Sequence, residues 1–384
     1  MTRGLGIAVV CYPGLGGSGI VASELANGLA ARGHRVTVLA TARPARSAGD
    51  VAFERIDVPV SPVFEHGPYD IAVASHLVEL ARRQAIDVVH LHYAIPHAAS
   101  ALLAAQVLGA AAPAMVVTLH GTDVTRLGAH PELRPVTSFA LAAAAGVTTP
   151  SRYLRGEAAA CFGLAPERIE VISNFVDLAR FGPPPRRDRR LAELFGDGDG
   201  DDGPILFHAS NFRPIKRAPQ LLDVLARVRA HVPARLVLVG DGPEHAAARA
   251  RATELGVDGA TRFLGWRDAF DDLLEHADGF VLASESESFG LAALEAMAAG
   301  VPVYGYRVGG LPEVVGDAGR LVASGDVDAL AAAIVAAGPD RERLGRAGRT
   351  RAEQLFRSDA VVAQYEAYFR RLLGASRAVA RGIR

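Results

Sequence analysis

The sequence predicts an α/β protein with two doubly wound, Rossmann-like domains that face a central cleft. The chain has 384 residues and is 50% hydrophobic, which is more than one ordinary core needs and suits two domains. Short β-branched runs alternate with Ala- and Leu-rich helical stretches, as in parallel sheets covered by helices on both faces. This alternation stops once and restarts near residue 204.

The first series of strands predicts a domain over residues 1–175. Its six runs are GIAVV (6–10), RVTVLA (35–40), DVVHLH (87–92), MVVTLH (115–120), GVTT (146–149) and IEVIS (169–173). Helical stretches separate these runs, so neighbouring strands are expected to pair in parallel.

The second series predicts another domain over residues 176–358. Its runs are PILFHAS (204–210), ARLVLVGDG (234–242), TRFLGW (261–266), GFVLASES (279–286), VPVYGY (301–306) and GRLVASG (319–325). A last helical stretch, 359–384, has apolar residues at helical spacing and can pack on either domain, including back on the first.

The composition between the two series is that of a connector. Three prolines occupy 183–185, RRDRR follows at 186–190, and GDGDGDDG spans 196–203. Such residues make a poor core, so we place the domain boundary near 175–185 and interpret RRDRR as a solvated helix start.

Composition and charge exclude several protein classes. The net charge is −1, which argues against a nucleic-acid surface or a polybasic membrane anchor. Cys11 and Cys161 lie far apart with no CxxC pattern, so we expect no disulfide framework and a cytoplasmic location. The N-terminus is interpreted as a strand and not a signal peptide, and 101–119 as a helix, turn and strand and not a membrane span. Homo-oligomerisation is left open.

A glycine-rich loop, GLGGSG, spans residues 14–19 between the first strand and a helix. Glycines let the backbone approach a ligand, and a helix start offers N–H groups to an anion. The spacing GxGGxG and the lack of an acidic residue after the second strand fit a dinucleotide fingerprint poorly. We favour an anion or acceptor site over a purely structural turn.

Histidines cluster at two predicted strand ends, HLHYAIPHAA (90–99) and TLHGTDVT (118–125). No nearby Cys, Asp or Glu has metal-ligand spacing, so no zinc site is expected. The glycine after His120 leaves room for a ligand, and Thr122 and Asp123 can cap the next helix.

Lys216 is the single lysine among 41 basic side chains. It lies in SNFRPIKRAP (210–219), flanked by Arg213 and Arg217, just before a helix. A compact cation beside a helix N-terminus suits a diphosphate.

A turn and helix are predicted within SESESFGLAALEAMAAGVPV (284–303). Because serine is favoured as an N-cap, Ser286 or Ser288 is expected to start the helix near Gly290. The N–H groups expected to point at a phosphate or sugar are those of Phe289, Gly290 and Leu291.

Two carboxylates of the same segment, Glu287 and Glu295, invite a functional interpretation. Glu287 stands at the rim of the turn and can accept hydrogen bonds from sugar hydroxyls. Glu295 lies in an otherwise apolar helix, where a carboxylate needs partners, and can bind the two hydroxyls of a ribose. The alternative is a capping-box acid at 287 and a solvated residue at 295.

Together these motifs resemble the retaining, nucleotide-sugar-dependent glycosyltransferases of family 4, which have a two-Rossmann-domain B-type fold. The resemblance covers nearly the whole chain, with Glu287 and Glu295 as the E-x7-E element. CYPGLGGSG, HLHYAIPHA, TLHGTDVT and SNFRPIKR are most similar to the subgroup that makes GlcNAc-malate for bacillithiol biosynthesis. This implies UDP-GlcNAc as donor, L-malate as acceptor, and no metal or other cofactor. It also implies acceptor binding by the first domain and donor binding by the second.

The resemblance also implies roles for individual residues. Catalytic roles fall to His120, Lys216 and Glu287. The residues implied to bind the nucleotide sugar are Gly17, Asn211, Arg213, Lys216, Ser288, Phe289, Gly290, Leu291 and Glu295. Those implied to bind the acceptor are Gly16, Ser18, Tyr93 and Thr122, with Arg152 as a further candidate. The family usually has an arginine where this chain has Asn211, and Arg213 is a candidate for the missing charge.

The expected reaction is attack of the malate hydroxyl on the same face of the sugar that the diphosphate leaves. Alternatives are a family-4 enzyme with another acceptor, such as an inositol phosphate or a lipid-linked sugar, a UDP-sugar epimerase, and a non-catalytic UDP-sugar-binding protein.

Overall fold

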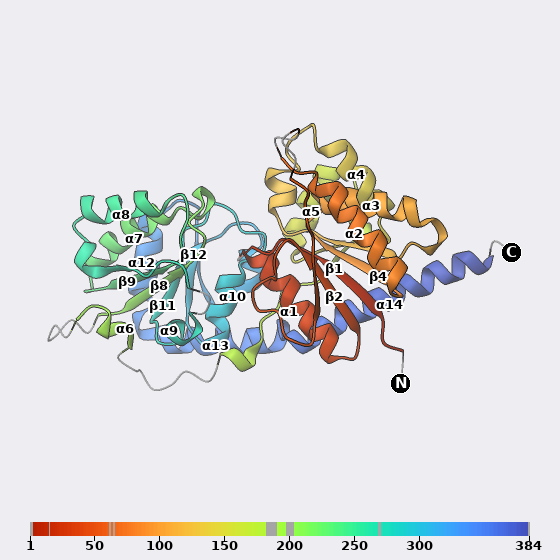
Figure 1. Ribbon diagram of the computed structural model, residues 1–384. Coiled ribbons are helices and arrows are strands. Elements are labelled where there is room, and N and C mark those ends of the chain that lie inside the picture. Colours follow the sequence, from red (N-terminus) through yellow and green to blue (C-terminus); the bar gives the residue numbers. More distant parts are fainter. Residues whose placement is uncertain are drawn as a thin grey trace. The chain divides into compact units, whose positions relative to one another are not determined.

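Two parallel β-sheets organise the chain, each within its own compact unit. The structure, a computed structural model, describes residues 3–14, 16–60, 63, 66–181, 190–196, 203–267 and 270–382 (Figure 1). One unit comprises Met1–Asn174 with Ser358–Arg384, and the other comprises Phe175–Arg357. The three prolines, most of RRDRR and most of the Gly/Asp run fall outside the described residues, so the connector prediction is not addressed there.

The first unit has a seven-stranded sheet in the order β3-β2-β1-β4-β5-β6-β7. Its strands are β1 Gly6–Val10, β2 Arg35–Ala40, β3 Ala52–Arg55, β4 Val88–His92, β5 Ala114–Thr118, β6 Gly146–Thr149 and β7 Ile169–Val171. All pairings are parallel. The sequence interpretation missed β3, because AFER is a partly exposed edge strand without the apolar run that marked the others.

Helices cover both faces of this sheet. They are α1 Gly17–Ala31, α2 Tyr69–Arg83, α3 His97–Leu108, α4 Arg134–Ala143 and α5 Arg152–Phe162, with the short turns η1 Gly109–Ala111, η2 Thr122–Arg126 and η3 Pro166–Arg168. Helices α2 to α5 share one apolar core with the sheet, whereas α1 contacts the C-terminal helix. The segment 101–119 forms α3, η1 and β5, as expected. Within the described part of the chain, no helix is both long and apolar enough to cross a membrane.

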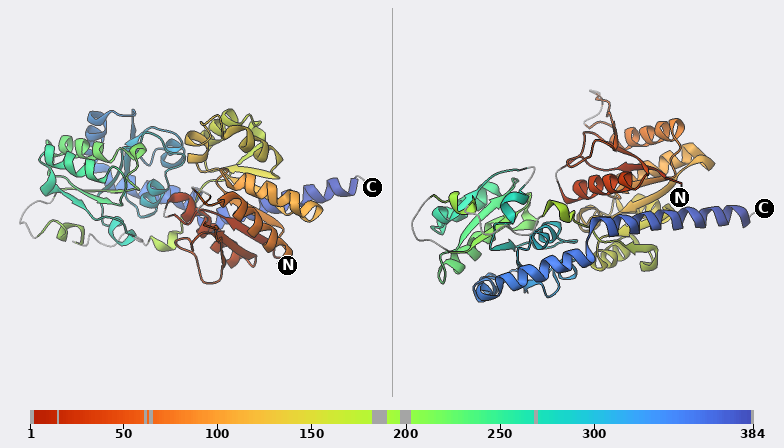
Figure 2. Two further views of the ribbon diagram at one scale, coloured as in Figure 1. Left: turned by 45° about the horizontal axis from the view of Figure 1, so that its top comes forward. Right: turned by 90° about the horizontal axis from the view of Figure 1, so that it is seen from below.

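The C-terminal helix α14 (Ser358–Gly382) belongs to the first unit, although the whole of the second unit precedes it in the chain (Figure 1). Its apolar stripe is buried, as expected for a helix packed on one side; the buried residues are Val361, Val362, Tyr365, Tyr368 and Phe369. Helix α1 lies against it at Gly28, where an added Cβ would come within 2.6 Å of Val362. Figure 2 shows α14 in two further orientations.

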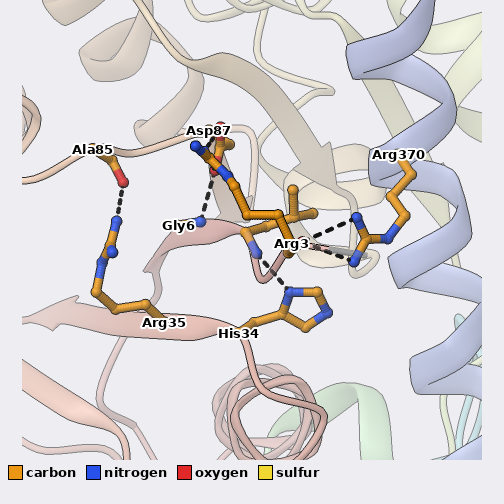
Figure 3. Close-up of polar contacts among 8 residues, drawn as sticks. Arg3, Gly6, His34, Arg35, Ala85, Asp87 and Arg370 are labelled. Atoms are coloured by element: carbon orange, nitrogen blue, oxygen red, sulfur yellow. Dashed lines mark hydrogen bonds and ion pairs between the residues drawn. The ribbon is translucent and has the colours of Figure 1, made fainter. Parts of the chain in front are cut away.

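Polar contacts fasten α14 to the amino ends of the strands (Figure 3). The guanidinium group of Arg370 donates two hydrogen bonds, each of 3.3 Å, to the main-chain carbonyl of Arg3. Arg3 forms an ion pair of 3.0 Å with Asp87, which also accepts the N–H of Gly6 at 2.8 Å. The start of β1, the residue before β4 and the last helix are therefore joined in one network.

Glu366 adds a charged group to this network. Its carboxylate pairs with Arg32 at 2.8 Å and with Arg370 at 2.9 Å, and it lies 3.5 Å from the ring of His34. Burial raises the pKa of Glu366, but the hydrogen bonds from the two arginines outweigh that effect and lower it to about 2.

The second unit repeats the same topology with six parallel strands in the order β10-β9-β8-β11-β12-β13. The strands are β8 Ile205–Ala209, β9 Arg235–Val239, β10 Thr261–Phe263, β11 Gly279–Leu282, β12 Val303–Tyr306 and β13 Gly319–Val322. The helices are α6 Arg190–Glu193, α7 Ala218–Arg229, α8 His245–Glu254, α9 Asp271–Leu274, α10 Leu291–Ala298, α11 Leu311–Val315, α12 Val327–Ala336 and α13 Arg341–Leu355, with the short turns η4 Leu178–Arg180, η5 Pro214–Lys216, η6 Asp258–Ala260 and η7 Gly338–Asp340. Separate apolar cores lie on the two faces of the sheet. The predicted fold class, two Rossmann-like α/β domains, is confirmed.

Candidate active site

The predicted site residues lie where the strand order of each sheet reverses. In the first unit this point falls between β1 and β4, and in the second between β8 and β11. Open α/β sheets bind ligands beyond the carboxyl ends of the strands at such points. The loops that follow these four strands contain most of the residues that the sequence singled out.

In the second unit, the single lysine meets the first glutamate of the E-x7-E element. The ammonium nitrogen of Lys216 lies 2.7 Å from Oε1 of Glu287. The hydroxyl of Ser284 donates to the same carboxylate oxygen, also at 2.7 Å. Glu287 is buried, with 8% of its surface exposed, whereas the side chain of Lys216 is 22% exposed. A charged pair held at a strand end is a suitable place for a ligand with both phosphates and hydroxyls.

The two loops that carry this pair are joined through their backbones. The N–H of Glu285, in the loop after β11, donates to the carbonyl of Ile215, in the loop after β8, at 2.8 Å. Within the same loop, Arg213 is exposed, whereas the Oδ1 atom of Asn211 is buried without a hydrogen-bond partner among the described residues. A buried acceptor without a partner is costly, so this amide is suited to a ligand group.

Helix α10 starts differently from the prediction. Its N-cap is Gly290, with φ +97°, and no side chain caps the helix, so the expectation that Ser286 or Ser288 starts it is wrong. The left-handed backbone conformation at this position favours glycine. Gly290 is therefore the residue before the helix, in place of a capping serine. Phe289 just before it is buried against Phe356 and anchors the turn. The N-terminal N–H groups of α10, from Leu291 onward, follow directly.

The alternative roles for the two glutamates do not hold. Glu287 bonds to Lys216 and Ser284 and caps no helix, and Glu295 is only 5% exposed inside α10, so it is not a solvated surface residue. Buried carboxylates are kept where partners or ligands satisfy them. Ser288, the residue after Glu287, is half-buried.

In the first unit, the glycine-rich loop leads directly into α1. Gly16 is the N-cap and Gly17 the first helical residue, with Ser18 half-buried in the first turn; Leu15 lies outside the described residues. A Cβ on Gly16 would meet open space, whereas one on Gly19 would come within 2.4 Å of the Gly14 carbonyl. The loop therefore combines a sterically required glycine with an open helix N-terminus.

His120 follows β5 and contacts His92 and Tyr93, which lie at the end of β4 and just after it. Its Nε2 atom lies 2.9 Å from Nδ1 of His92, the last residue of β4. Its ring lies 5.3 Å from that of Tyr93, centroid to centroid. Tyr93 has φ +79°, which is rare for a side chain of this size and typical of functional loops. The structure thus brings together His120 and Tyr93 from separate loops.

Asp123 has a role that the sequence interpretation assigned wrongly. Neither Thr122 nor Asp123 caps the following turn η2, whose N-cap is Gly121. Instead, Asp123 accepts hydrogen bonds from the N–H groups of His120, Gly121 and Ala94, at 3.0 to 3.1 Å. Burial raises the pKa of Asp123 to about 6, and these backbone hydrogen bonds oppose that rise. Asp123 therefore ties the loops after β4 and β5 together.

Burial makes the histidines of this cluster poor bases. It lowers the pKa of His90 and of His120 to about 3 and that of His97 to about 4, and it lowers the pKa of His92 well below its usual range. All four rings are therefore neutral near pH 7. Across the residues that the structure describes, no three His, Cys, Asp or Glu side chains form a metal-binding group.

The remaining acceptor candidates follow the carboxyl ends of β5 and β6 in the same sheet. Thr122 is half-buried in η2, and Arg152 is exposed at the first position of α5, after β6. Sequence reasoning missed Ser284, His92 and the aromatic neighbour Tyr12, whose ring contacts Tyr93 at 5.8 Å. Each is a polar or aromatic residue near the end of a strand. Such residues are common in the sequence, so this feature did not distinguish them.

Comparisons with known proteins agree with this geometry. The family model described as Glycosyltransferase Family 4 matches residues 15–180, and that described as Glycosyl transferases group 1 matches residues 203–338. The N-acetyl-alpha-D-glucosaminyl L-malate synthase of Bacillus anthracis is 38% identical over 375 residues, which cover 95% of this chain and 96% of that protein. A GDP-mannose-dependent alpha-(1-6)-phosphatidylinositol monomannoside mannosyltransferase of Mycolicibacterium smegmatis is 33% identical over 72% of this chain and 74% of its own.

Solved structures share the fold over the whole length. HepE of Anabaena, crystallised with UDP and glucose, superposes with a TM-score of 0.77 at 20% identity and covers 95% of this chain and 99% of its own. The sucrose-phosphate synthase of Thermosynechococcus elongatus gives 0.78 at 22% identity, with 97% and 100% covered. From the full-length match in sequence and the two Rossmann-like units, the chain belongs to glycosyltransferase family 4 and is a glycosyltransferase.

Proposed function

We propose that the enzyme transfers N-acetylglucosamine from UDP-GlcNAc to the hydroxyl of L-malate, with retention of the α-anomer, for bacillithiol biosynthesis. The observation that carries the proposal is the 38% identity to a GlcNAc-malate synthase over nearly the full length of both chains. The free thiols Cys11 and Cys161 support a cytoplasmic setting for this reaction.

The donor side of the proposal depends on Lys216 and the start of α10. Cleavage of the anomeric C–O bond places negative charge on the leaving UDP, and a fixed cation and helix N–H groups stabilise that charge without a metal. The carboxylate of Glu287 holds the ammonium group of Lys216 at 2.7 Å, so the charge is in place before the donor binds. Glu287 also accepts hydrogen bonds from hexose hydroxyls, and Glu295 from the ribose.

Asn211 and Arg213 complete the donor side in this proposal. Asn211 replaces the arginine that is usual in the family, and its buried Oδ1 atom, without a partner in the part of the chain that the structure describes, can accept a hydrogen bond from the donor substrate. Arg213 is exposed nearby in sequence and supplies positive charge to the diphosphate. In this proposal the backbone that faces the diphosphate is formed by Ser288, Phe289 and Gly290.

The acceptor side depends on hydrogen-bond donors, because malate carries two carboxylates. The N-terminus of α1 at Gly16, Gly17 and Ser18 offers backbone N–H groups of the kind that bind anions. Tyr93 and Thr122 add hydroxyl groups, and Arg152 adds a charge at the start of another helix.

In the transfer step, the malate oxygen forms a bond to the anomeric carbon as the bond from that carbon to UDP breaks. Attack occurs on the face that UDP leaves, and a phosphate oxygen of UDP takes the proton of the malate hydroxyl. His120 contacts the transferred sugar. Excluding water from this step limits hydrolysis of the donor.

The test measures UDP release by the purified protein with UDP-GlcNAc and a panel of acceptors. Malate should give fast release, and NMR of the product should show an α-glycoside of malate. Inositol phosphates, lipid-linked sugars, other hydroxy acids and water should give little release. Faster release with another acceptor would replace malate, and conversion of UDP-GlcNAc without any acceptor would indicate an epimerase.

The single lysine allows a direct test of the donor site. Reductive ¹³C-methylation labels Lys216 and the N-terminal amine, which differ in pKa and are told apart in an NMR titration. UDP should shift the Lys216 signal and leave the N-terminal signal unchanged. Binding of UDP without a shift at Lys216 would place the diphosphate elsewhere.

A further inference from the structure

A buried histidine lies directly behind His120. His92 is fully buried at the end of β4, and its Nδ1 atom lies 2.9 Å from Nε2 of His120. The proposed reaction gives His120 a contact with the sugar and gives His92 none. The hydrogen bond between the two rings nevertheless restricts which nitrogen of His120 carries its proton.

Two neutral imidazole rings at this distance share a single hydrogen. Either His92 donates from Nδ1 to Nε2 of His120, or His120 donates from Nε2 to Nδ1 of His92. Burial lowers the pKa of both histidines, so a doubly protonated ring is not the resting form near neutral pH. The choice between the two arrangements depends on the other nitrogen of His92.

That nitrogen, Nε2 of His92, is buried and has no hydrogen-bond partner among the described residues. If His120 were the donor, this atom would carry a buried N–H with no acceptor. If His92 is the donor, the same atom carries only a lone pair. A buried N–H without an acceptor is the rarer and more costly defect, so His92 is the donor.

We propose that His92 is a positioning residue that holds His120 in the Nδ1–H tautomer. His120 then carries its proton at Nδ1, while its Nε2 lone pair is engaged by His92 and cannot accept the acceptor's proton. A donor suits a sugar oxygen or the charge that develops on the leaving side. This inference rests on the proposed function, because that function supplies the ligand of His120, the transferred sugar.

The surroundings keep His92 from rotating away. The ring of His90 packs on it with 4.5 Å between centroids. Nε2 of His90 lies 2.7 Å from the hydroxyl of Thr118, which lies 2.6 Å from that of Thr148. The ring of Tyr365, from α14, lies 5.4 Å from that of His90, centroid to centroid. The main chain of His120 is meanwhile held by Asp123.

The first experiment observes the tautomer by ¹H–¹⁵N correlation of the imidazole rings in ¹⁵N-labelled, full-length, ligand-free protein. The His120→Gln variant identifies the His120 signals. We expect a protonated Nδ1 and an unprotonated Nε2 in His120. The opposite pattern, with Nε2 of His120 protonated, would overturn the proposal. This readout needs no substrate, so it stands or fails separately from the identity of the acceptor.

The second experiment compares two substitutions of His92. His92→Phe keeps the ring volume but removes the donor, so His120 should lose its single tautomer and kcat/KM for UDP release should fall roughly tenfold. His92→Asn packs less well, but its amide nitrogen takes the place of Nδ1. It should restore the tautomer and bring kcat/KM back to within about threefold of wild type.

The order of the two variants separates positioning from packing. If His92 only filled space, Phe would be the better replacement and Asn the worse one. Thermal unfolding of both variants records the packing effect separately. Activity of His92→Phe equal to or above that of His92→Asn would refute the positioning role.

Discussion

Replacing Lys216 with alanine removes one member of a partly buried ion pair and leaves the other in place. At 2.7 Å, the attraction between Lys216 and Glu287 is about 6 kcal/mol with an effective dielectric constant near 20, and desolvation of both groups offsets much of it. Removing one partner leaves Glu287 buried, and among the described residues Ser284 remains as its side-chain donor. We expect a loss of about 3 kcal/mol in the free energy of unfolding, at the lower end for buried pairs because Lys216 is 22% exposed.

The assay uses the single tryptophan of the chain. Trp266 lies in the second unit, so its fluorescence during urea denaturation reports on the unit that contains Lys216. Arg227→Ala is the matched control, because Arg227 and Asp328 form a pair of 2.8 Å whose side chains are 61% and 79% exposed. That variant should change the free energy of unfolding by less than about 1 kcal/mol.

A double variant separates stability from catalysis. Lys216→Ala with Glu287→Gln removes the unpaired charge, so most of the lost stability should return. Turnover should stay low, because loss of one group that stabilises the leaving diphosphate typically costs on the order of 10²–10³ in rate. If Lys216→Ala unfolded at the same urea concentration as wild type, the ion pair would contribute nothing. If it also kept near-normal UDP release, Lys216 would have no catalytic role.

Three further predictions concern other parts of the molecule. Glu295→Gln should weaken UDP binding roughly tenfold in calorimetry while kcat at saturating donor changes little, and unchanged affinity would exclude the ribose role. Gly290→Ala should destabilise the second unit by about 1–3 kcal/mol in the Trp266 assay, because φ is +97° and the new Cβ would lie 2.6 Å from Leu311; wild-type stability would contradict this. The pKa of Glu366 is lowered to about 2, so its stabilising contribution is present above its ordinary pKa of 4.5 and is lost as the pH falls from there towards 2. Amide exchange of the first unit should therefore become less dependent on pH over that window in Glu366→Gln, and an unchanged dependence would rule this contribution out.

Most strands and helices could be predicted because their signal is local. Buried parallel strands such as β1, β4 and β9 are short segments rich in Val, Ile and Leu, and the apolar spacing of α14 marks a helix with one buried face. β3 was missed because an edge strand is buried on fewer sides and needs fewer apolar residues. The start of α10 was wrong because the tertiary turn requires a left-handed residue, which overrides the preference of serine for N-caps.

The candidate site was only partly predictable for a different reason. Lys216, Glu287, Glu295 and His120 stood out as unusual residue types at strand ends or within an apolar helix. The bond between Lys216 and Glu287 did not, since the two residues are brought together by the pairing of β8 with β11. Asp123 was assigned to a helix cap because its local sequence does not reveal its partner Ala94. Ala94 follows β4, and only the pairing of β4 with β5 brings it close to Asp123.

The linear order of residues was enough to specify the period of each element, the number of domains and the chemical groups available for donor binding. The period of each element depends on spacing within a dozen residues, where backbone geometry dictates which side chains share a face. The number of domains follows from the chain length and from the single restart of the strand–helix alternation. Which groups touch depended on the order of strands in each sheet, which places His92 beside His120 and packs α14 against α1. Such contacts join segments that are distant in the sequence. They form when complete faces of helices and sheets pack together, and a short sequence pattern contains no information on that packing.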